Sequence, residues 1–340
     1  MLVARLHNAA DLRVADEQVP VPPAGMSLVR VTAVGICGSD LHWWAEGGIG
    51  DALLGPPLVP GHEAAGVIAS GPRQGERVAI DPAIACGTCP QCLRGYRNLC
   101  VNVVFAGHGS QDGAMREYLA WPSHLLHRLP DSLSDADGAL LEPLGVAIHA
   151  ADLGHLRLAG SAAVIGCGPI GLLLIQVLRV AGASSVIAVD PLPQRRAAAR
   201  RLGADLAIDP AQAGDADEIA LGAEGGALAR SGVDVAFEMA GTDDGVQLAF
   251  SLVQAGGRVL LGGIPGDDLI RFQASVARRK GLTIAMVRRM NETYPRAIGL
   301  AAAGKVDLAI VSDRFPLAKA SEAFSHAAAR SGLKTLVECG

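Results

Sequence analysis

Short apolar runs separated by turn residues fill the first part of the chain. β-branched and other apolar residues recur over about the first 150 positions, and Gly or Pro interrupts most of the runs. The clearest runs are LVARL at 2–6, LRVAD at 12–16, SLVRVTAVG at 27–35, AAGVIAS at 64–70 and RVAIDP at 77–82. This pattern predicts an irregular, β-rich domain that carries long loops.

From Ser161 onward the pattern changes to strands that alternate with helices. Strand-like runs occur at 161–166, 184–190, 205–209, 234–241 and 257–264, and helical patterns occur at 170–183 and 193–204. Such alternation is typical of a parallel, doubly wound sheet with α/β architecture. We therefore predict a Rossmann domain over residues 148–283. Residues 1–147 form the β-rich domain, and the tail 284–340 is expected to complete it.

Length and charge narrow the classes of function. A chain of 340 residues, half of them apolar, is long enough for about two domains. A net charge of −5 argues against a nucleic-acid partner. The densest basic run, RRAAARR at 195–201, has helical spacing and is expected to be a solvated helix face.

One uncharged stretch, Leu158 to Leu178, has the length of a membrane span. It contains GCGPIG, however, which is typical of a strand, a tight turn and a helix. The N-terminus lacks a basic segment followed by an apolar core, so no signal peptide is expected. We predict a cytoplasmic protein with no membrane partner. In that compartment its seven cysteines favour metal ligation over disulfides.

Four of these cysteines, in the run CGTCPQCLRGYRNLC, have the spacing of a metal site. Cys86, Cys89, Cys92 and Cys100 are three, three and eight residues apart. Four thiolates suit a tetrahedral Zn²⁺ with no open position, which indicates a structural zinc. The competing interpretation is an iron–sulfur cluster, but the late fourth cysteine, with no Pro after it, departs from that pattern.

A second, mixed set of ligands lies upstream. Cys37 in GICGSD and His62-Glu63 in GHE offer a thiolate, an imidazole and a carboxylate. Three protein ligands leave a position open for substrate, as a catalytic zinc requires. Because neighbouring residues on a regular strand point to opposite faces, His62 and Glu63 can share a metal only if the backbone turns there. Otherwise Glu63 lies outside the ligand shell, or Glu142 in LLEPLGVAIHA takes its place.

The run Gly166-x-Gly168-x-x-Gly171 predicts a dinucleotide site. It follows a strand, opens a helix and precedes Asp190 at the end of the next strand. The glycines let the backbone approach a pyrophosphate, and Asp190 can accept hydrogen bonds from ribose hydroxyls while repelling a 2′-phosphate. This favours NAD over NADP, although Arg195 and Arg196 could hold a phosphate. A flavin-binding or nucleotide-free Rossmann domain is the alternative. The predicted cofactor contacts are Gly166, Gly168, Pro169, Ile170, Gly171, Asp190, Arg195 and Gly262.

Taken in order, these motifs resemble the medium-chain zinc-dependent alcohol dehydrogenase family over essentially the whole chain. The sorbitol dehydrogenase-like branch is the most similar. The segments that carry this likeness are CGSDLHWWAEGGIGD, PGHEAAGV, EPLGVAIHA, GCGPIG, RRKGLTI and RRMNETYPRAI. The resemblance implies a GroES-like catalytic domain beside the Rossmann domain, two zinc ions per chain and a homotetramer or homodimer.

The resemblance also implies roles for individual residues. Cys37, His62 and Glu63 would ligate the catalytic zinc, with Glu142 near or on it. Ser39 and His42 would carry a proton from the substrate hydroxyl toward solvent. Further implied roles are an adenosine-ribose pair of Asp190 and Arg195, an arginine reaching toward the substrate at Arg289, and an aromatic pocket wall at Phe105. Trp43 would also lie at the substrate, and both Trp43 and Met290 stand where that branch often has tyrosines.

The expected activity is NAD-dependent oxidation of a secondary alcohol, with a polyol such as sorbitol or xylitol as the small-molecule substrate. The absence of the two tyrosine hydroxyls weakens the prediction that the substrate is a polyol. An L-idonate 5-dehydrogenase-like or L-threonine 3-dehydrogenase-like activity is therefore the alternative within enzymes. Outside enzymes, the alternative is a nucleotide-binding relative without catalysis.

Overall fold

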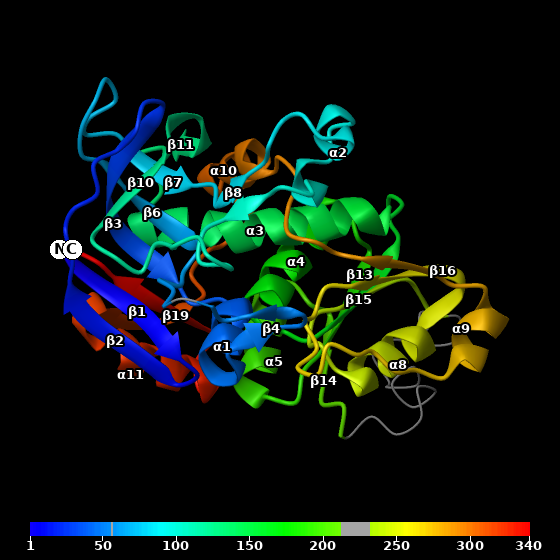
Figure 1. The fold of residues 1–340 in the computed structure, drawn as a ribbon. Coiled ribbons are helices and arrows are strands. Elements are labelled where there is room, and N and C mark those ends of the chain that lie inside the picture. Colours follow the sequence, from blue (N-terminus) through cyan, green and yellow to red (C-terminus); the bar gives the residue numbers. More distant parts are fainter. Residues whose placement is uncertain (56, 212–231) are drawn as a thin grey trace. The chain divides into compact units, whose positions relative to one another are not determined.

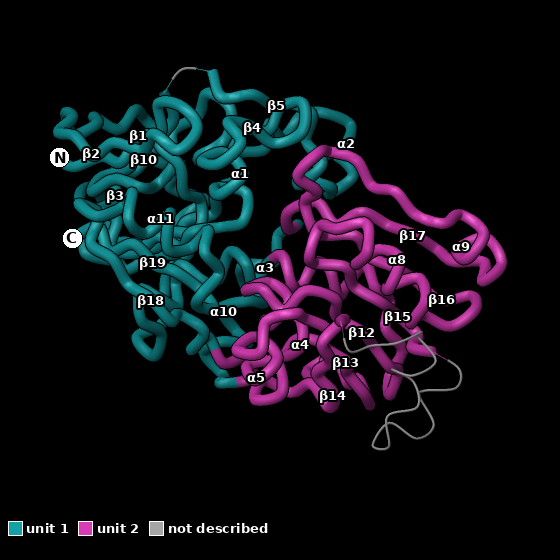
Figure 2. The backbone as a smooth tube through the Cα atoms, turned by 90° about the horizontal axis from the view of Figure 1, so that it is seen from below, with its two compact units in different colours: residues 1–145, 291–304, 308–340 teal, residues 146–290, 305–307 magenta. Residues whose placement is uncertain are grey.

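The computed structural model describes residues 1–55, 57–211 and 232–340. It divides into two compact units (Figure 2). Unit 1 comprises residues 1–145, 291–304 and 308–340, and unit 2 comprises residues 146–290 and 305–307. The sequence predicted the changes of domain at 147/148 and 283/284.

The strands of unit 1 include the five runs expected from the sequence. They are β1 (Leu2–Asn8), β2 (Asp11–Asp16), β3 (Met26–Gly35), β4 (Gly48–Ile49), β5 (Ala52–Leu53), β6 (Glu63–Ile68), β7 (Arg77–Ile80), β8 (Ala83–Ile84), β9 (Val104–Phe105), β10 (Tyr118–Pro122), β11 (Leu126–Arg128), β18 (Val311–Pro316) and β19 (Lys334–Glu338). Within the described part of this unit, one sheet of seven strands has the order β11-β7-β6-β3-β19-β18, with β10 also paired to β3. The last strand of the chain therefore pairs with β3 (Figure 1).

Helices and loops accompany this sheet, and α3 is the longest of these helices. The α-helices are α1 (Gly38–Glu46), α2 (Pro90–Leu93), α3 (Asp135–Gly154), α10 (Tyr294–Ala302) and α11 (Ala320–Ala328), and the 3-10 helices are η1 (Arg97–Leu99), η2 (Ser123–Leu125) and η3 (Leu317–Lys319). Trp43 from α1, Trp121 from β10 and Phe324 from α11 lie in one buried apolar cluster with the sheet residues. The boundary between the units, at 145/146, falls within α3.

Unit 2 has the predicted α/β fold. Its elements are β12 (Ser161–Ile165), α4 (Pro169–Val180), β13 (Ser185–Val189), α5 (Pro193–Arg201), β14 (Leu206–Ile208), β15 (Val233–Glu238), α8 (Asp243–Leu252), β16 (Val253–Leu261), α9 (Ala274–Lys280) and β17 (Thr283–Met286). Six strands of its described residues form one sheet in the order β14-β13-β12-β15-β16-β17. Every neighbouring pair is parallel. The order reverses between β12 and β15, which is where sheets of this kind bind ligands.

Two details of unit 2 bear on the sequence predictions. All five residues of β12 are buried, as expected of a strand covered on both faces. The uncharged stretch 158–178 is divided between β12 and α4, as its glycine-rich turn predicted. No helix in the described ranges combines the length and the apolar character of a bilayer crossing. β17 pairs with β16, so residues 284–286 continue the parallel sheet beyond the predicted change of domain at 283/284.

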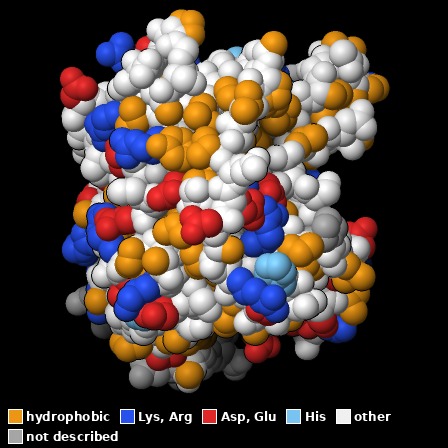
Figure 3. Space-filling view, turned by 60° about the vertical axis from the view of Figure 1, so that its left-hand side comes forward, with side chains coloured by type: hydrophobic (Ala, Val, Ile, Leu, Met, Phe, Trp, Pro, Cys, Tyr) orange, Lys and Arg blue, Asp and Glu red, His pale blue; other side chains and the backbone are white. Residues whose placement is uncertain are grey.

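One face of the molecule carries side chains of mixed character (Figure 3). On the face drawn in Figure 3, acidic and basic side chains are interspersed, with apolar groups between them. The basic run of α5 is only partly solvated, because Arg196 forms an ion pair with Asp209 at 3.0 Å and donates to two backbone carbonyls. Arg200 and Arg201 are exposed, as the helical spacing predicted.

Lys280 connects two helices of unit 2. It is the last residue of α9, and its Nζ donates to the carbonyl oxygens of Phe250, Ser251 and Val253 at 2.9, 2.7 and 2.7 Å. These carbonyls lie at the C-terminal end of α8, where a helix leaves its acceptors unpaired and favours a positive charge.

We expect Lys280→Met to lower the free energy of unfolding by about 2 kcal/mol, because it removes charged hydrogen bonds from a half-buried helix end. Thermal denaturation should show a Tm lower by roughly 5 °C. Lys305→Met is the matched control, since Lys305 is exposed. An equal Tm for both variants would mean that this cap contributes nothing to stability.

Candidate active site

Three of the predicted ligands converge in unit 1. One ligand atom each from Cys37, His62 and Glu63 lies within 4.8 Å of the other two. Cys37 is the N-cap of α1, and Glu63 is the first residue of β6. His62 precedes the strand and follows Gly61, whose φ of 93° lies in the left-handed region. The backbone turn required by adjacent ligands is therefore present, because His62 lies outside the regular strand.

Asp40 orders this cluster, and sequence reasoning did not single it out. Its carboxylate is fully buried and accepts hydrogen bonds from the backbone N–H of Cys37 at 2.9 Å and of Gly61 at 3.1 Å. The same carboxylate lies 3.4 Å from Nδ1 of His62. An imidazole oriented by a carboxylate is a common arrangement in metal sites, since it sets the tautomer and the ring direction. The signal was available in Cys-x-x-Asp, the spacing of a capping box.

Burial and charge together set the protonation of this pair. Burial alone would lower the pKa of His62, but Asp40 and Cys37 together, through charge and hydrogen bonds, hold that pKa well above its usual value. Burial likewise opposes ionisation of Asp40, and the charge of His62 with the hydrogen bonds to Asp40 holds its pKa below the usual range. A metal ion binds only the neutral ring, so it would displace the proton on one nitrogen, while Asp40 remains the partner of Nδ1.

Glu142 lies close to the cluster without joining it. It extends from α3, is 4% exposed, and does not belong to the group formed by Cys37, His62 and Glu63. Burial raises the pKa of Glu142 to about 7, and the neighbouring charge of Glu63 adds to that rise. Of the two carboxylates left open by the sequence, the structure brings Glu63 to the cysteine and the histidine.

Glu63 has an unusual partner, Lys334 of β19, which the sequence did not reveal. The Lys334 ammonium and the Glu63 carboxylate form an ion pair, and both side chains are almost fully buried. The ammonium faces Oε2 of Glu63, and this oxygen is buried. A carboxylate that lies within 4.8 Å of both a thiol and an imidazole fits a site for a borderline-soft cation such as Zn²⁺.

The residues expected around the substrate differ in their burial and in their contacts. Ser39 and His42 lie three residues apart on α1 and are half-buried, and Nδ1 of His42 is 2.9 Å from Oε1 of Glu46. The ring of Phe105 is tilted against that of His62, with centroids 5.3 Å apart. Trp43 is only 1% exposed and meets His108 edge to face, so packing accounts for its position.

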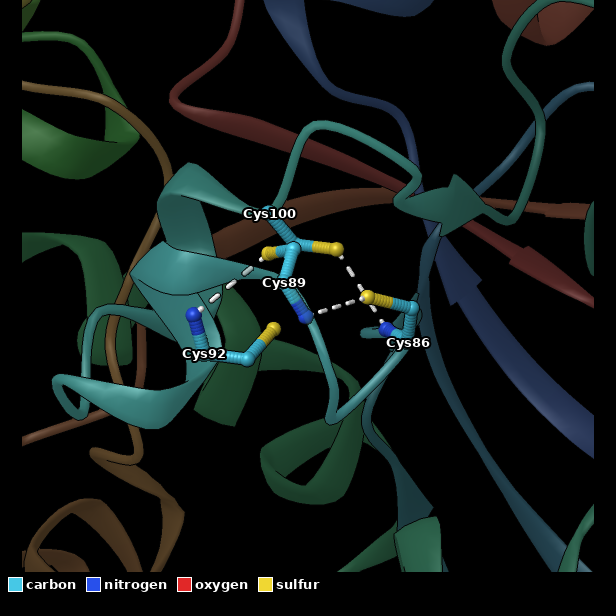
Figure 4. A group of neighbouring side chains, drawn as sticks. All are labelled: Cys86, Cys89, Cys92 and Cys100. Atoms are coloured by element: carbon cyan, nitrogen blue, oxygen red, sulfur yellow. Dashed lines mark hydrogen bonds between the residues drawn. The ribbon is translucent and has the colours of Figure 1, made fainter.

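The four cysteines form a compact lobe around α2 (Figure 4). Their ligand atoms all lie within 4.8 Å of one another. Backbone N–H groups point at the sulfurs, from Cys86 to Cys100 at 3.3 Å, from Cys89 to Cys86 at 3.3 Å and from Cys92 to Cys89 at 3.5 Å. Backbone donors lower the pKa of Cys86 to about 5, which favours the thiolate that binds metal. This donor set fits a closed tetrahedral site.

The glycine-rich turn lies at the carboxyl end of β12. Gly166 has a φ of 95°, and a Cβ there would be 2.8 Å from the backbone nitrogen of Ala240 in the turn after β15. A Cβ at Gly171 would collide with the carbonyl oxygen of Gly166. Gly168 is the N-cap of α4. A Cβ at Gly168 would have free space around it, with Nη1 of Arg195 at 3.9 Å. The turn therefore leaves the N-terminus of α4 without a side chain over it, as an anion site requires.

Asp190 directly follows β13, the strand next to this turn. It is 3% exposed and accepts hydrogen bonds from the backbone N–H of Cys167 and of Leu192, each at 2.8 Å. Arg195 lies 3.9 Å from it. Gly262 follows β16, where a Cβ would be 2.7 Å from the sulfur of Met239. The side chain of Asp190 thus holds the fingerprint turn and the start of α5 in place.

Comparison with known proteins decides the family. The model of the alcohol dehydrogenase GroES-like domain matches residues 23–131, and the model described as zinc-binding dehydrogenase matches residues 169–303. The sorbitol dehydrogenase of Bacillus subtilis (strain 168) is 34% identical over 336 residues, 96% of this chain and 93% of that protein. The chain belongs to the medium-chain zinc-dependent alcohol dehydrogenase family.

Further relatives agree with this assignment. The D-xylulose reductase A of Aspergillus niger is 34% identical over 339 residues, 96% of this chain and 93% of that protein. The solved L-idonate 5-dehydrogenase from Escherichia coli str. K-12 superimposes with a TM-score of 0.91 at 26% identity, covering 99% of this chain and 97% of that one. The fold class, the family and the assignment as a dehydrogenase are thereby confirmed.

The remaining predicted residues of this dehydrogenase lie in unit 2. Arg289 is half-buried and has a φ of 55°, which is uncommon outside glycine. Met290 is 7% exposed. Arg196 forms an ion pair with Asp209. Arg195 is the arginine that lies beside Gly168 of the glycine-rich turn.

We expect Gly171→Ala to weaken NADH binding by at least about tenfold, because the new methyl group pushes α4 away from the turn that faces the pyrophosphate. Fluorescence titration with NADH measures this. Gly299→Ala in α10 is the control, because nothing lies within 4 Å of a Cβ there. Unchanged NADH affinity in Gly171→Ala would contradict the assignment of the turn.

Proposed function

We propose that this dehydrogenase oxidises a polyol such as sorbitol or xylitol to a ketose, with NAD as the hydride acceptor. The convergence of Cys37, His62 and Glu63 in a chain that also carries a dinucleotide turn is the observation that supports this most strongly. The names of the relatives, sorbitol dehydrogenase and D-xylulose reductase, support the choice of a polyol.

In this proposal two zinc ions have separate roles. Cys37, His62 and Glu63 hold the catalytic ion, with Glu142 close enough to influence it electrostatically. Cys86, Cys89, Cys92 and Cys100 hold the structural ion. The lobe is tied to the segment after unit 2 by Asn291, which accepts from the N–H of Arg97 at 3.2 Å and donates to Gly95 at 2.9 Å.

We also propose a cytoplasmic location. None of the cysteines in the described residues forms a disulfide, which supports this location.

The chemistry follows from these groups. When bound, zinc supplies a Lewis acid that polarises the alcohol oxygen, and NAD accepts the hydride. Ser39 accepts the hydroxyl proton as it releases its own, and His42, one helical turn further along α1, receives the released proton and passes it toward solvent with Glu46 as its hydrogen-bond partner. General-base assistance of this kind is typically worth about 10²–10⁴-fold in rate. Phe105 forms an apolar wall beside His62.

NAD is proposed over NADP because of Asp190. Its buried carboxylate, at the end of the strand after the glycine-rich turn, offers acceptors to ribose hydroxyls and repels a 2′-phosphate. Arg195 completes the adenosine end of the site, with Gly166, Gly168, Pro169, Ile170 and Gly171 at the pyrophosphate and Gly262 at the edge of the sheet.

We also propose a homodimer or a homotetramer. β17 is an outer strand of the unit 2 sheet, and its Ile284 and Met286 are 38% and 61% exposed. An apolar outer strand can extend its sheet by pairing with the same strand of a second copy around a twofold axis.

The direct test is NADH appearance at 340 nm with NAD and a panel of sorbitol, xylitol, galactitol, L-idonate, L-threonine and 2,3-butanediol. We expect turnover of the polyols and inhibition by 1,10-phenanthroline. Turnover of L-idonate alone would replace the polyol by a sugar acid, with Arg289 as the candidate carboxylate partner. A protein that binds NADH and zinc but turns over no alcohol would be a nucleotide-binding relative.

Two cysteine substitutions separate the metal sites. Cys37→Ser should abolish most activity and one of two bound zincs while leaving Tm nearly unchanged, because it removes a ligand of the catalytic ion only. Cys89→Ser should lower Tm by roughly 5 °C or more through loss of the lobe's ion. Zinc analysis and thermal denaturation provide the readouts. Equal loss of Tm in both variants would contradict the division into two sites.

A further inference from the structure

Lys334 is a buried cation beside the proposed catalytic metal. It is the first residue of β19, and its side chain is 1% exposed. Its Nζ donates to the carbonyl oxygen of Ile36 at 2.8 Å and forms an ion pair with Glu63. Ile36 directly precedes Cys37, so one ammonium group contacts the backbone next to one proposed ligand and the side chain of another.

The sheet register creates the space for this pair. Gly35, the last residue of β3, pairs with Glu63 of β6 on one side and with Leu336 of β19 on the other. A Cβ at Gly35 would collide with Oε2 of Glu63 and would lie 2.9 Å from Cε of Lys334. The absence of a side chain at Gly35 therefore lets the lysine and the carboxylate meet over β3.

The charges around Glu63 indicate what the contact between Lys334 and Glu63 does. Cys37 and Glu63 would bring negative charge to the metal, and Glu142 is a further buried carboxyl group close to them. Lys334 is the cation in contact with Glu63. A carboxylate held by a lysine has one preferred direction and less freedom to rotate away from Cys37 and His62.

We propose that Lys334 is a positioning residue of the metal site, which acts through Glu63 by fixing its carboxylate relative to Cys37 and His62. This inference rests on the proposed function, because it requires a metal at those three residues. Lys334 touches neither the reacting atoms nor the cofactor in this proposal, and its effect is on the affinity and the geometry of the metal.

The experiment compares Lys334→Met and Lys334→Arg in the full chain. Zinc affinity is measured by chelator competition, and the visible spectrum of the Co²⁺-substituted protein reports the coordination. We expect Lys334→Met to weaken the less tightly held metal about 10–100-fold and to shift the Co²⁺ bands, as the loss of such an outer partner typically does. Lys334→Arg should restore most of the affinity.

Two internal controls accompany these variants. The ion of the four-cysteine lobe should be retained in both, because that lobe does not contact Lys334. Lys280→Met removes another lysine that donates to backbone carbonyls, and it should lower Tm without changing the affinity of either metal. An unchanged metal affinity and Co²⁺ spectrum in Lys334→Met, with only a lower Tm, would overturn the proposal.

Loss of a buried partner can unfold a protein, so a second comparison uses Glu63→Gln as the background. Because Lys334 acts through Glu63, adding Lys334→Met to Glu63→Gln should change the metal affinity less than twofold. The same factor in both backgrounds would show that the lysine does not act through the carboxylate. If the unmodified protein binds no metal at Cys37, the proposed function fails instead, and Cys37→Ser distinguishes that case.

Discussion

The arrangement of unit 1 depends on the place of β3 in its sheet. β3 pairs with β6 along one edge, and on the other edge its second half pairs with β19, the last strand of the chain. The end of β3 therefore brings together the turn with Cys37, the first residue of β6 and the first residue of β19. Three segments far apart in sequence meet there because backbone hydrogen bonds fix their register. A slip of one residue in either pairing would turn Glu63 or Lys334 to the other face.

Burial gives the charged groups at this point their properties. Asp40, His62, Glu63, Glu142 and Lys334 are each at most 6% exposed. A charge in such surroundings persists only when a partner of opposite charge or several hydrogen bonds compensate for the lost water. Asp40 pairs with His62 and Lys334 with Glu63, while Glu142 has a raised pKa instead. The site is thus preorganised by two ion pairs that also hold the backbone around Cys37.

The predicted cofactor site of unit 2 depends on glycines that let turns approach closely, whereas the site of unit 1 depends on buried charges. The turns after β12, β15 and β16 approach one another so closely that side chains on Gly166 or Gly262 would meet the neighbouring turn. This close approach leaves the N-terminus of α4 facing the point where the strand order reverses. A dinucleotide needs that combination, since its pyrophosphate is held by backbone N–H groups and the dipole of a helix.

Local patterns in the sequence determined the main strands of both units, the helices α4 and α5, the four-cysteine lobe, the glycine-rich turn and the family. Each of these depends on residues close together in the chain, or on spacings that a short loop enforces. The tertiary structure decided which residues meet across the sheet. It placed Glu63 rather than Glu142 with Cys37 and His62, and it revealed Asp40 as the partner of His62. Trp43, which the resemblance suggested for the substrate pocket, is buried in the core. The tertiary structure also brought Lys334, for which the sequence predicted no role, to Glu63. No local pattern specifies that pairing, because it follows from the register of strands from opposite ends of the chain.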